Sequence, residues 1–389
     1  MNRKRVMFVF GTRPEAIKMA PVVKAVEQYR DMLEPLVVVT GQHRQMLDQV
    51  LKLFAITPDY DLEIMEENQT ITGIVTKSLR GLEEIILREK PEMILVQGDT
   101  STAFAAGLAA FYYKIPLGHI EAGLRTFDKW RPFPEEMNRK MISDLADLHF
   151  PPTATAMGHL LEEKVPREKI YLTGNTVIDA LLDVAGRKYD LGKVGIKVSR
   201  TKKNILVTTH RRESFGEPIR NICAALKRLA DTFRREVEFI IPVHRNPLVK
   251  NVVSEMLGAS DNIKLIEPLD YEPFVHLMKE AYIILTDSGG VQEEAPSLGK
   301  PVLVMREKTE RPEAIAAGSV KLVGMDEQVI FDETTRLLTD KKEYDKMAKA
   351  INPYGDGQAS RRIVASLLHY FGILDKKPEE FNAKIPDQR

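Results

Sequence analysis

Short apolar runs alternate with longer amphipathic segments along the first half of the chain. Runs of four or five mostly apolar residues predict strands at Val6–Phe10, Leu36–Thr40, Met93–Gln97, Pro116–Ile120 and Ile170–Thr173. Apolar residues at helical spacing predict helices at Pro14–Tyr29, His43–Phe54, Gly73–Arg88, Thr102–Tyr113 and Glu135–Ala146. Because strand and helix alternate, the pattern predicts a doubly wound parallel sheet.

The alternation stops and then begins again. Residues 187–203 are rich in Lys, Gly and Val without a sustained period, which predicts a linker. A helix is then expected at Pro218–Phe233, and strands at Ile205–Thr209, Val237–Val243, Ile263–Ile266, Ile283–Thr286 and Val302–Met305. We therefore predict an α/β protein with Rossmann-like domains over 1–186 and 204–360, and a last helix near 361–376 that crosses back onto the first domain.

Composition removes several classes of function. The 389 residues include 56 Lys plus Arg and 56 Asp plus Glu, so the formal net charge is zero. Nothing in that balance favours nucleic acid or an anionic membrane as a partner. Cys223 is the only cysteine, which excludes intramolecular disulfides and cysteine-rich metal sites. The basic start, Met1–Arg5, precedes only five apolar residues, so we predict a cytoplasmic protein.

One stretch in the second half has the features of a phosphate site. A buried strand at Ile283–Thr286 is followed by Asp287, Ser288, Gly289 and Gly290, and then by a helix start that contains Glu293 and Glu294. Free N–H groups at a helix start favour an anion, and a carboxylate one turn later suits ribose hydroxyls. An ordinary strand-to-helix turn, with Asp287 or Ser288 as its cap, is the alternative. Since no G-x-G-x-x-G follows Val6–Phe10, no dinucleotide cofactor is expected.

Acidic residues follow several strands of the first half. Asp99 follows Met93–Gln97, Glu121 follows Pro116–Ile120, and Glu135 opens a helix. Three carboxylates at one edge of a sheet would raise at least one pKa, which suits proton transfer. The alternatives are that Asp99 caps a helix, that Glu121 pairs with Arg125, and that the acids bind a divalent metal, although no His lies beside them.

Basic residues lie at comparable positions. Arg13 and Lys18 follow the first strand, and His210 with its two following arginines comes after the strand at Ile205–Thr209. The sequence of residues 13–17, RPEAI, recurs at 311–315. Either the repeat reflects good helix-start chemistry, with proline in the first turn, or Arg13 and Arg311 bind the same anionic ligand.

These motifs closely resemble those of the non-hydrolysing UDP-N-acetylglucosamine 2-epimerases. They are GTRPEAIK (11–18), TGQHRQML (40–47), VQGDT (96–100), HIEAGLRT (119–126), PFPEEMNR (132–139), TGNTVID (173–179), THRRESFG (209–216), DSGGVQEEA (287–295) and ERPEA (310–314). The resemblance implies a GT-B fold with two Rossmann-like domains facing each other across a cleft. It also implies a homodimer that needs no cofactor or metal and takes UDP-N-acetylglucosamine and UDP as its ligands.

The resemblance also implies roles for individual residues. The catalytic set is Asp99, Glu121, Glu135 and His210. The substrate-binding set is Arg13, Lys18, Arg139, Phe274, Ser288, Gly289, Gly290, Glu294 and Arg311. A second, allosteric molecule of substrate would be bound by Gln42, Gln45, Gln69, Glu136, Arg212 and His244. Leu269 stands where many relatives have a polar residue, so the resemblance does not extend to this position on the uracil side.

The expected reaction is reversible epimerisation at C2 by elimination and re-addition of UDP, which would supply precursors for a cell-surface polysaccharide. A glycosyltransferase, a hydrolysing epimerase and a non-catalytic sugar-nucleotide sensor are the competing classes. A glycosyltransferase has no reason to gather three carboxylates, and a sensor has no need of the full acidic set. Which carboxylate acts on which face of C2 stays open at this point.

Overall fold

The computed structural model describes residues 3–41, 44–66 and 69–383. The chain divides into two compact units, one built from Met1–Ala180 with Tyr354–Asn382 and the other built on Leu181–Pro353. The division falls inside helix α7 (Thr176–Gly186), so the chain passes between the units within a helix and again after Pro353.

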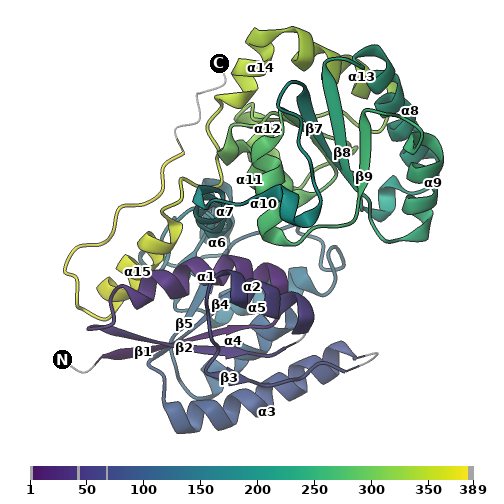
Figure 1. Cartoon of the computed structure of the whole chain (residues 1–389). Coiled ribbons are helices and arrows are strands. Elements are labelled where there is room, and N and C mark those ends of the chain that lie inside the picture. The colour runs from purple at the N-terminus through teal and green to yellow at the C-terminus, as the bar shows by residue number, and fades with distance from the viewer. Residues whose placement is uncertain (1–2, 42–43, 67–68, 384–389) are drawn as a thin grey trace. The chain divides into compact units, whose positions relative to one another are not determined.

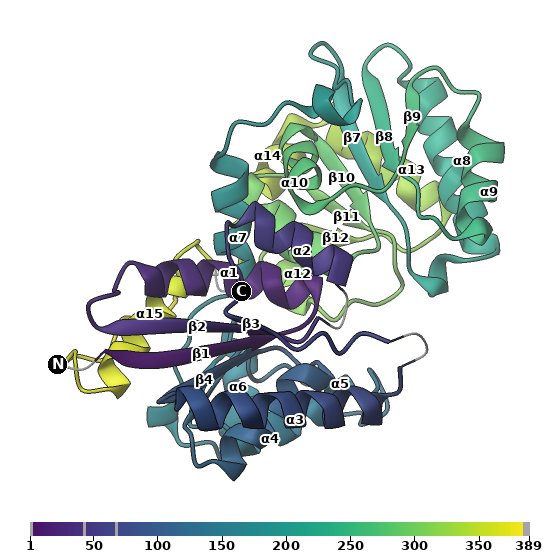
Figure 2. The ribbon, with the colours of Figure 1, turned by 60° about the horizontal axis from the view of Figure 1, so that its bottom comes forward.

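The first unit is a six-stranded parallel sheet with helices on both faces (Figures 1 and 2). Its strand order is β3-β2-β1-β4-β5-β6. The strands are β1 (Lys4–Phe10), β2 (Leu33–Val39), β3 (Tyr60–Asp61), β4 (Met93–Gln97), β5 (Leu117–Ile120) and β6 (Leu148–Phe150). The helices are α1 (Arg13–Glu27), α2 (Arg44–Leu53), α3 (Ile71–Glu89), α4 (Ser101–Tyr112), α5 (Glu135–Leu145), α6 (Ala154–Glu162), the 3₁₀ turn η1 (Arg167–Lys169) and α15 (Ala359–Tyr370).

Central strands of this sheet are apolar throughout because both of their faces are covered. Val6–Phe10 of β1 and all of β4 are buried, whereas the edge strand β3 has a half-buried and an exposed residue. This is the pattern expected of a parallel sheet between two layers of helices.

The second unit repeats the same architecture. Its strands are β7 (Lys203–Thr208), β8 (Val237–Pro242), β9 (Ile263–Ile266), β10 (Ile283–Thr286), β11 (Val302–Val304) and β12 (Val320–Leu322). The strand order is β12-β11-β10-β7-β8-β9. If the strands of this unit are numbered from one to six along the chain and the sheet is read from β9, the order is 3-2-1-4-5-6, the same doubly wound order as in the first unit. Its helices are α8 (Glu217–Thr232), α9 (Pro247–Leu257), α10 (Tyr271–Glu280), α11 (Gly289–Glu294), α12 (Pro312–Ala316), α13 (Glu327–Thr339), α14 (Lys341–Ala348) and the 3₁₀ turns η2 (Leu191–Val194), η3 (Arg212–Ser214) and η4 (Ala295–Leu298).

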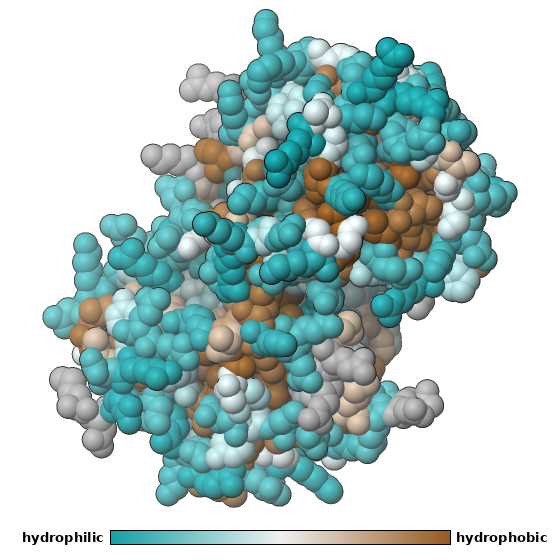
Figure 3. Space-filling view, in the orientation of Figure 1, coloured by the Kyte–Doolittle hydropathy of each residue, from teal (hydrophilic) through white to brown (hydrophobic). Residues whose placement is uncertain are grey.

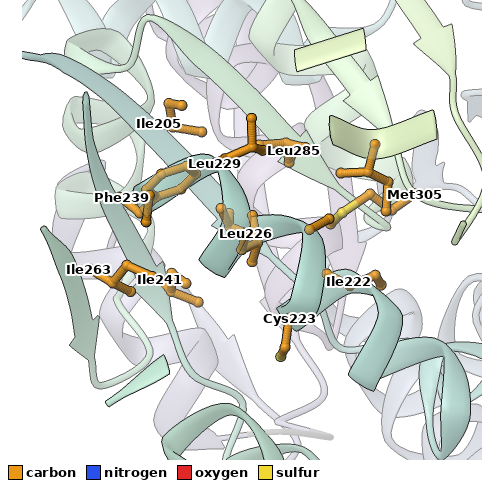
Figure 4. Packing of buried hydrophobic residues seen from close by; sticks show 14 of the residues in the cluster. Ile205, Ile222, Cys223, Leu226, Leu229, Phe239, Ile241, Ile263, Leu285 and Met305 are labelled. Carbon is orange, nitrogen blue, oxygen red and sulfur yellow. The ribbon is translucent and has the colours of Figure 1, made fainter. Parts of the chain in front are cut away.

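Helix α8 supplies one side of the core of this unit. Its buried residues Ile222, Cys223, Leu226 and Leu229 face apolar side chains of four strands and of the residue that follows β11 (Figure 4). Those side chains are Ile205, Phe239, Ile241, Ile263, Leu285 and Met305. Cys223 therefore packs as a small apolar residue, and burial raises the pKa of its thiol to about 12.

The prediction of two doubly wound parallel sheets is confirmed, and the limits of β4, β9 and β10 are those predicted. The strand predicted at Ile170–Thr173 is wrong, because only an isolated bridge joins Ile170 to His149. Ile170 is apolar for another reason: it packs against Ala122 and Leu160. The prediction omitted β3, β6 and β12, which have two or three residues each and so are too short for a periodic signal.

The chain returns to the first unit after Pro353. Helix α15 lies beside α1 (Figure 2), and its residues Ile363, Val364, Leu367 and Leu368 are buried. The carboxylate of Asp179 accepts hydrogen bonds from the amides of Ala359, at 3.2 Å, and Ser360, at 2.8 Å. An acid at this helix start satisfies N–H groups that lack helical partners.

Hydrophilic residues cover most of the face seen in Figure 3 on both units. Within the described ranges, no helix combines the length and the apolar character needed to cross a membrane.

Candidate active site

The predicted site residues gather where open α/β sheets bind ligands. In each unit the strand order reverses between two neighbouring strands, β1 and β4 in the first and β7 and β10 in the second. The loops that leave the carboxyl ends of such strands form the usual ligand site of this architecture. Each of these four loops carries charged residues, and the two units are described in turn.

The loop after β1 is tied to the loop after β4 by Glu15. This buried carboxylate accepts hydrogen bonds from the amides of Gly11, at 3.1 Å, and Thr12, at 2.8 Å, and from the hydroxyl of Thr100, at 2.7 Å. A Cβ on Gly11 would lie 2.0 Å from the hydroxyl of Thr40, so only glycine fits there. Glu15 therefore has a structural role at the start of α1, and burial raises its pKa.

Glu121 is the most constrained acid of the first unit. Its carboxylate lies 2.5 Å from the ammonium of Lys18 and accepts hydrogen bonds from the amide groups of Asn175, at 3.1 Å, and Gln97. Its backbone has a φ of +65°, in the left-handed region that residues with side chains seldom adopt. The backbone conformation and the contacts with Lys18, Asn175 and Gln97 together fix the orientation of the Glu121 carboxylate.

Asp99 lies in the same polar cluster. Its carboxylate is 2.7 Å from Nε of Arg139, and its carbonyl oxygen accepts a hydrogen bond of 2.9 Å from Asn138. Burial raises the pKa of the Asp99 carboxyl, the negative charge of Glu121 acts in the same direction, and Arg139 and Lys18 act against them. The two predicted catalytic acids therefore influence each other, as expected of a pair that handles protons.

Glu135 and Glu136 open α5 but have different surroundings. Glu136 is buried and accepts hydrogen bonds from the amides of Thr126 and Phe127 and, at 3.0 Å, from Arg139. Glu135 is half-buried, and among the residues that the structure describes its buried Oε2 atom has no hydrogen-bond partner. An oxygen atom of Glu135 can therefore accept a further hydrogen bond, whereas the carboxylate of Glu136 binds Arg139 and the turn before α5.

Arg13 begins α1 near this cluster. The proline that follows it lies in the first helical turn, as predicted, and the second RPEAI segment begins α12 in the same way. The two segments do not occupy equivalent places, since one follows the first strand of its unit and the other follows the fifth. Within ranges 3–41, 44–66 and 69–383, no ion pair or hydrogen bond of the Arg13 guanidinium is found.

In the second unit, Asp287 organises the loop that carries His210. Its buried carboxylate accepts hydrogen bonds of 2.9 Å from the amides of His210 and Arg211 and one of 3.1 Å from the hydroxyl of Ser214. Nδ1 of His210 lies 3.1 Å from the other carboxylate oxygen. Burial alone would raise the pKa of Asp287, but His210 and the amides outweigh it and lower the pKa. With Nδ1 turned to Asp287, Nε2 is the ring nitrogen left for a ligand.

Two guanidinium groups converge on the glycines after β10. A Cβ placed on Gly289 would lie 3.6 Å from Nη2 of Arg211 and 3.9 Å from Nη2 of Arg311. The buried Glu293 pairs with Nε of Arg311 and fixes its direction. Ser288 is the residue before α11, but its side chain makes no capping hydrogen bond. Two cations beside the N–H groups of a helix start are suited to an anion such as a diphosphate.

Two more of the predicted substrate-binding residues lie on the helices that precede and follow β10 in the chain. Glu294, near the end of α11, accepts a hydrogen bond of 2.9 Å from the hydroxyl of Tyr271. Phe274 is half-buried on α10, one turn after Tyr271. A carboxylate and an aromatic ring near the diphosphate site are suited to a ribose and a base.

The structure describes only part of the predicted allosteric set. The ring of His244 lies 6.4 Å from that of His210, Glu136 holds the turn before α5, and Gln69 precedes α3. Gln42 and the side chains of Gln45 and Arg212 lie outside the described part. The assignment of this set therefore stays a prediction.

A separate cavity of about 570 Å³ lies at the opposite edge of the second sheet, by the amino ends of its strands. Basic side chains dominate its lining, but the ammonium groups of Lys202, Lys203 and Lys279 donate to backbone carbonyl groups. These lysines are engaged in the fold, and none of the predicted site residues lines the cavity. In the part of the chain that the structure covers, no group of three His, Cys, Asp or Glu side chains is arranged to hold a metal ion.

The structure overturns three local alternatives. Thr100, not Asp99, caps α4, by accepting a hydrogen bond from the amide of Ala103 at 3.0 Å. Arg125 pairs with Glu163 rather than with Glu121. Asp287 binds the loop after β7 instead of capping a helix.

Sequence reasoning assigned no site role to Gln97 or Asn175, and it considered Asp287 only as a helix cap and Arg211 only as a neighbour of His210. Each is a polar residue that ends a strand, follows one directly or lies within a quoted motif, so position alone could have singled them out.

The comparisons with known proteins agree with the resemblance of the motifs. The family model described as UDP-N-acetylglucosamine 2-epimerase matches residues 24–368. A UDP-N-acetylglucosamine 2-epimerase of Bacillus subtilis is 51% identical over 387 residues, which cover 99% of this chain and 100% of the relative.

Solved structures of similar proteins extend the agreement to the fold. A crystal structure of a UDP-N-acetylglucosamine 2-epimerase is 49% identical and superimposes with a TM-score of 0.90, covering 98% of this chain and 100% of the other. A crystal structure of UDP-GlcNAc 2-epimerase from Neisseria meningitidis bound to UDP-GlcNAc is 50% identical with a TM-score of 0.83, covering 94% and 99% of the two chains. These relatives have the GT-B fold, which confirms the predicted fold class.

Proposed function

Because this chain belongs to the UDP-N-acetylglucosamine 2-epimerase family, we propose that it interconverts UDP-N-acetylglucosamine and UDP-N-acetylmannosamine by elimination and re-addition of UDP. The observation that carries the proposal is the pair formed by the half-buried Asp99 and the buried Glu121, whose charges influence each other beside Lys18. A GT-B protein that only bound or transferred a sugar would have no use for two coupled acids at this edge of the sheet.

UDP is held by residues of the second unit. Arg311 and Arg211 neutralise the diphosphate above the glycines of α11, His210 donates to it, and Glu294 accepts from the ribose hydroxyls while Phe274 packs against the uracil. Glu293 and Asp287 keep Arg311 and His210 in place, so the donors are arranged before the ligand arrives. Arg13, Lys18 and Arg139 complete the substrate-binding set.

The chemistry begins at the anomeric carbon, because the hydrogen at C2 is not adjacent to a carbonyl group and is too weakly acidic to be removed alone. The bond from C1 to the phosphate oxygen breaks, and its electron pair leaves with UDP. A carboxylate takes the C2 proton, and the electron pair of the C2–H bond forms the C1=C2 double bond of a bound 2-acetamidoglucal. Protonation of C2 from the opposite face and return of the UDP oxygen to C1 give the epimer.

The acids divide this work between the two faces of C2. The pKa of Asp99 is raised by burial, which favours a group that accepts and returns a proton near neutral pH. Glu121 is held by Lys18, Gln97 and Asn175, and Glu135 has a buried oxygen without a described partner. The assignment of each acid to a face is left to isotope experiments on single variants.

Further properties belong to this proposal. We propose a cytoplasmic homodimer in which a second molecule of UDP-N-acetylglucosamine activates the enzyme through Gln42, Gln45, Gln69, Glu136, Arg212 and His244. The product would enter the synthesis of a cell-surface polysaccharide. Sedimentation at several protein concentrations tests the dimer, and a sigmoidal dependence of rate on substrate tests the activation.

Incubation of the protein with UDP-N-acetylglucosamine alone tests the main proposal. An epimerase yields UDP-N-acetylmannosamine, and a hydrolysing epimerase yields free sugar and UDP. A glycosyltransferase that has no acceptor yields no epimer, and neither does a non-catalytic sensor. Nuclear magnetic resonance of the mixture distinguishes these products directly.

Isotopes test the mechanism. Turnover in D₂O should place deuterium at C2 of the product and leave the anomeric hydrogen in place. Substrate labelled with ¹⁸O at the bridging glycosidic oxygen should move the label into non-bridging positions of the β-phosphate, because UDP is released from C1 during turnover. Deuterium uptake without any movement of the oxygen label would contradict elimination.

A further inference from the structure

The buried residue His119 makes a contact that the proposed reaction does not yet use. It is fully buried on β5, and its Nε2 atom lies 2.7 Å from the carbonyl oxygen of Gly98. A carbonyl oxygen only accepts hydrogen bonds, so Nε2 carries the hydrogen and donates it. Gly98 is the residue between β4 and Asp99, so the bond reaches the backbone of a catalytic acid.

Burying a histidine side chain at this position is unfavourable for the stability of the fold. Burial lowers the pKa of His119 to about 3, so the ring is neutral, and within the described residues its Nδ1 atom is buried without a partner. A buried acceptor without a hydrogen bond destabilises the folded state. A leucine would fill the space without that cost, so the bond to Gly98 is the gain that histidine provides.

The bond matters because the turn at Gly98 has an unusual backbone. Gly98 has a φ of +69°, and its amide donates to the carbonyl of Ile120 at 2.9 Å. His119 and Glu121 flank Ile120, so the same stretch of β5 holds both the amide and the carbonyl of Gly98. Once the turn is fixed, Asn138 binds the carbonyl of Asp99 and Arg139 binds its carboxylate.

We propose that His119 is a positioning residue that sets the distance between the carboxylates of Asp99 and Glu121 by holding the Gly98 turn. It does not touch the substrate. This inference rests on the proposed function for its effect on turnover, but its effect on the turn itself is independent of any activity.

His149 provides a matched control. It is paired in register with His119 on the neighbouring strand β6, it is 1% exposed, and burial lowers its pKa to about 4. It makes no described hydrogen bond to the Gly98 turn. A purely structural role for buried histidines in this sheet would make the two positions respond alike.

The experiment compares His119→Leu, His119→Gln and His149→Leu with the unaltered protein. His119→Leu should lower kcat about 10- to 100-fold, the range expected when a catalytic group is displaced by about 1 Å, with KM and the Kd for UDP within about threefold. His119→Gln, which keeps a donor, should recover most of kcat. His149→Leu should keep kcat close to that of the unaltered protein while losing a similar amount of thermal stability.

Hydrogen exchange separates this inference from the proposed function. Amides of residues 96–103 should exchange faster in His119→Leu than in His149→Leu or the unaltered protein, whether or not the protein is an epimerase. Equal exchange in the two leucine variants, full turnover in His119→Leu or no recovery in His119→Gln would each overturn the inference. Failure of the unaltered protein to form an epimer would instead overturn the proposed function and leave the exchange result to decide the role of His119.

Discussion

Asp99 and Asp287 follow the fourth strand of two sheets with the same strand order, but their carboxyl groups behave in opposite ways. Burial acts on both. At Asp99 it prevails and raises the pKa, because a nearby acid adds to it and the counter-charges of Arg139 and Lys18 do not compensate. At Asp287 the ring of His210 and the backbone amides of Arg211 and His210 prevail over burial and lower the pKa. The same place in one architecture therefore holds an acid whose pKa is raised in one unit and an acid whose pKa is lowered in the other.

The difference comes from the loops rather than from the sheets. Around the glycines after β10, the second unit places the guanidinium groups of Arg211, which follows β7, and Arg311, which follows β11, so it presents positive groups to a ligand. After β4 the backbone carbonyl groups of Gly98 and Asp99 accept hydrogen bonds from His119 and Asn138, and within the described residues the Asp99 carboxylate pairs with Arg139. One fold thus supports two kinds of chemistry, as expected when function resides in the loops at strand ends.

The largest effect should come from neutralising the acids of the first unit. Asp99→Asn, Glu121→Gln and Glu135→Gln should each lower kcat by about 10²–10⁴-fold, the usual contribution of a positioned acid or base. UDP should still bind, because most of its proposed contacts lie in the second unit. Glu163→Gln, which removes a carboxylate that pairs with Arg125, serves as the control and should retain turnover. If calorimetry finds that the three variants no longer bind UDP, the acids support the fold instead of the reaction.

A smaller effect of a different kind should follow changes in the second unit. Arg311→Ala should raise the Kd for UDP about 10- to 100-fold, since hydrogen bonds to charged groups contribute about 1.5–3 kcal/mol. Glu294→Ala should raise it about tenfold through the lost ribose contact. Tyr271→Phe removes the hydroxyl that donates to Glu294 but keeps the carboxylate, so it is the control for packing. An unchanged Kd in both variants would remove these residues from the UDP site.

Stability should respond in opposite directions to the same substitution at the two aspartates. A lowered pKa means that Asp287 stabilises the fold above its ordinary pKa of about 3.9, and that this contribution is lost as pH falls through the lower folded value. Asp287→Asn should therefore cost about 1–3 kcal/mol at pH 7. A raised pKa means that ionised Asp99 opposes folding at pH 7, so Asp99→Asn should raise the urea midpoint, and the gain should vanish as pH falls through the raised folded pKa.

Urea unfolding at pH 7 and pH 4 measures both effects. Arg139 keeps Glu136 as a partner in Asp99→Asn, so the variant leaves no cation stranded. Midpoints that move in the same direction in both variants at pH 7 would show that the contrast between the two carboxyl groups is not real.

The smallest effect is expected when divalent metal is removed with EDTA. The rate of epimerisation should then stay within about twofold of its value before treatment. The diphosphate would be neutralised by arginine and lysine side chains rather than by a bridging ion. The measurement is the rate of epimerisation before and after dialysis against the chelator. Loss of activity that Mg²⁺ restores would contradict this prediction.

Strands with long apolar runs were predictable because burial on both faces leaves a continuous signal, as at β4 and β10. Short edge strands such as β3 and β12 were not, since two or three residues have no period. The same reason applies to the site. Charged residues directly after strands, such as Asp99 and Glu121, were found from position, whereas the partners of Asp287 depend on how separate loops approach each other. No local pattern encodes that approach.

The return of helix α15 to the first unit has a consequence for the order of events during synthesis. The second unit is built on one continuous stretch, Leu181–Pro353, and can fold as soon as it leaves the ribosome. The first unit lacks the helix beside α1 until Ala359–Tyr370 has emerged, and the Asp179 carboxylate lacks the amides of Ala359 and Ser360 until then. The half of the protein that is translated first is therefore the half that finishes folding last.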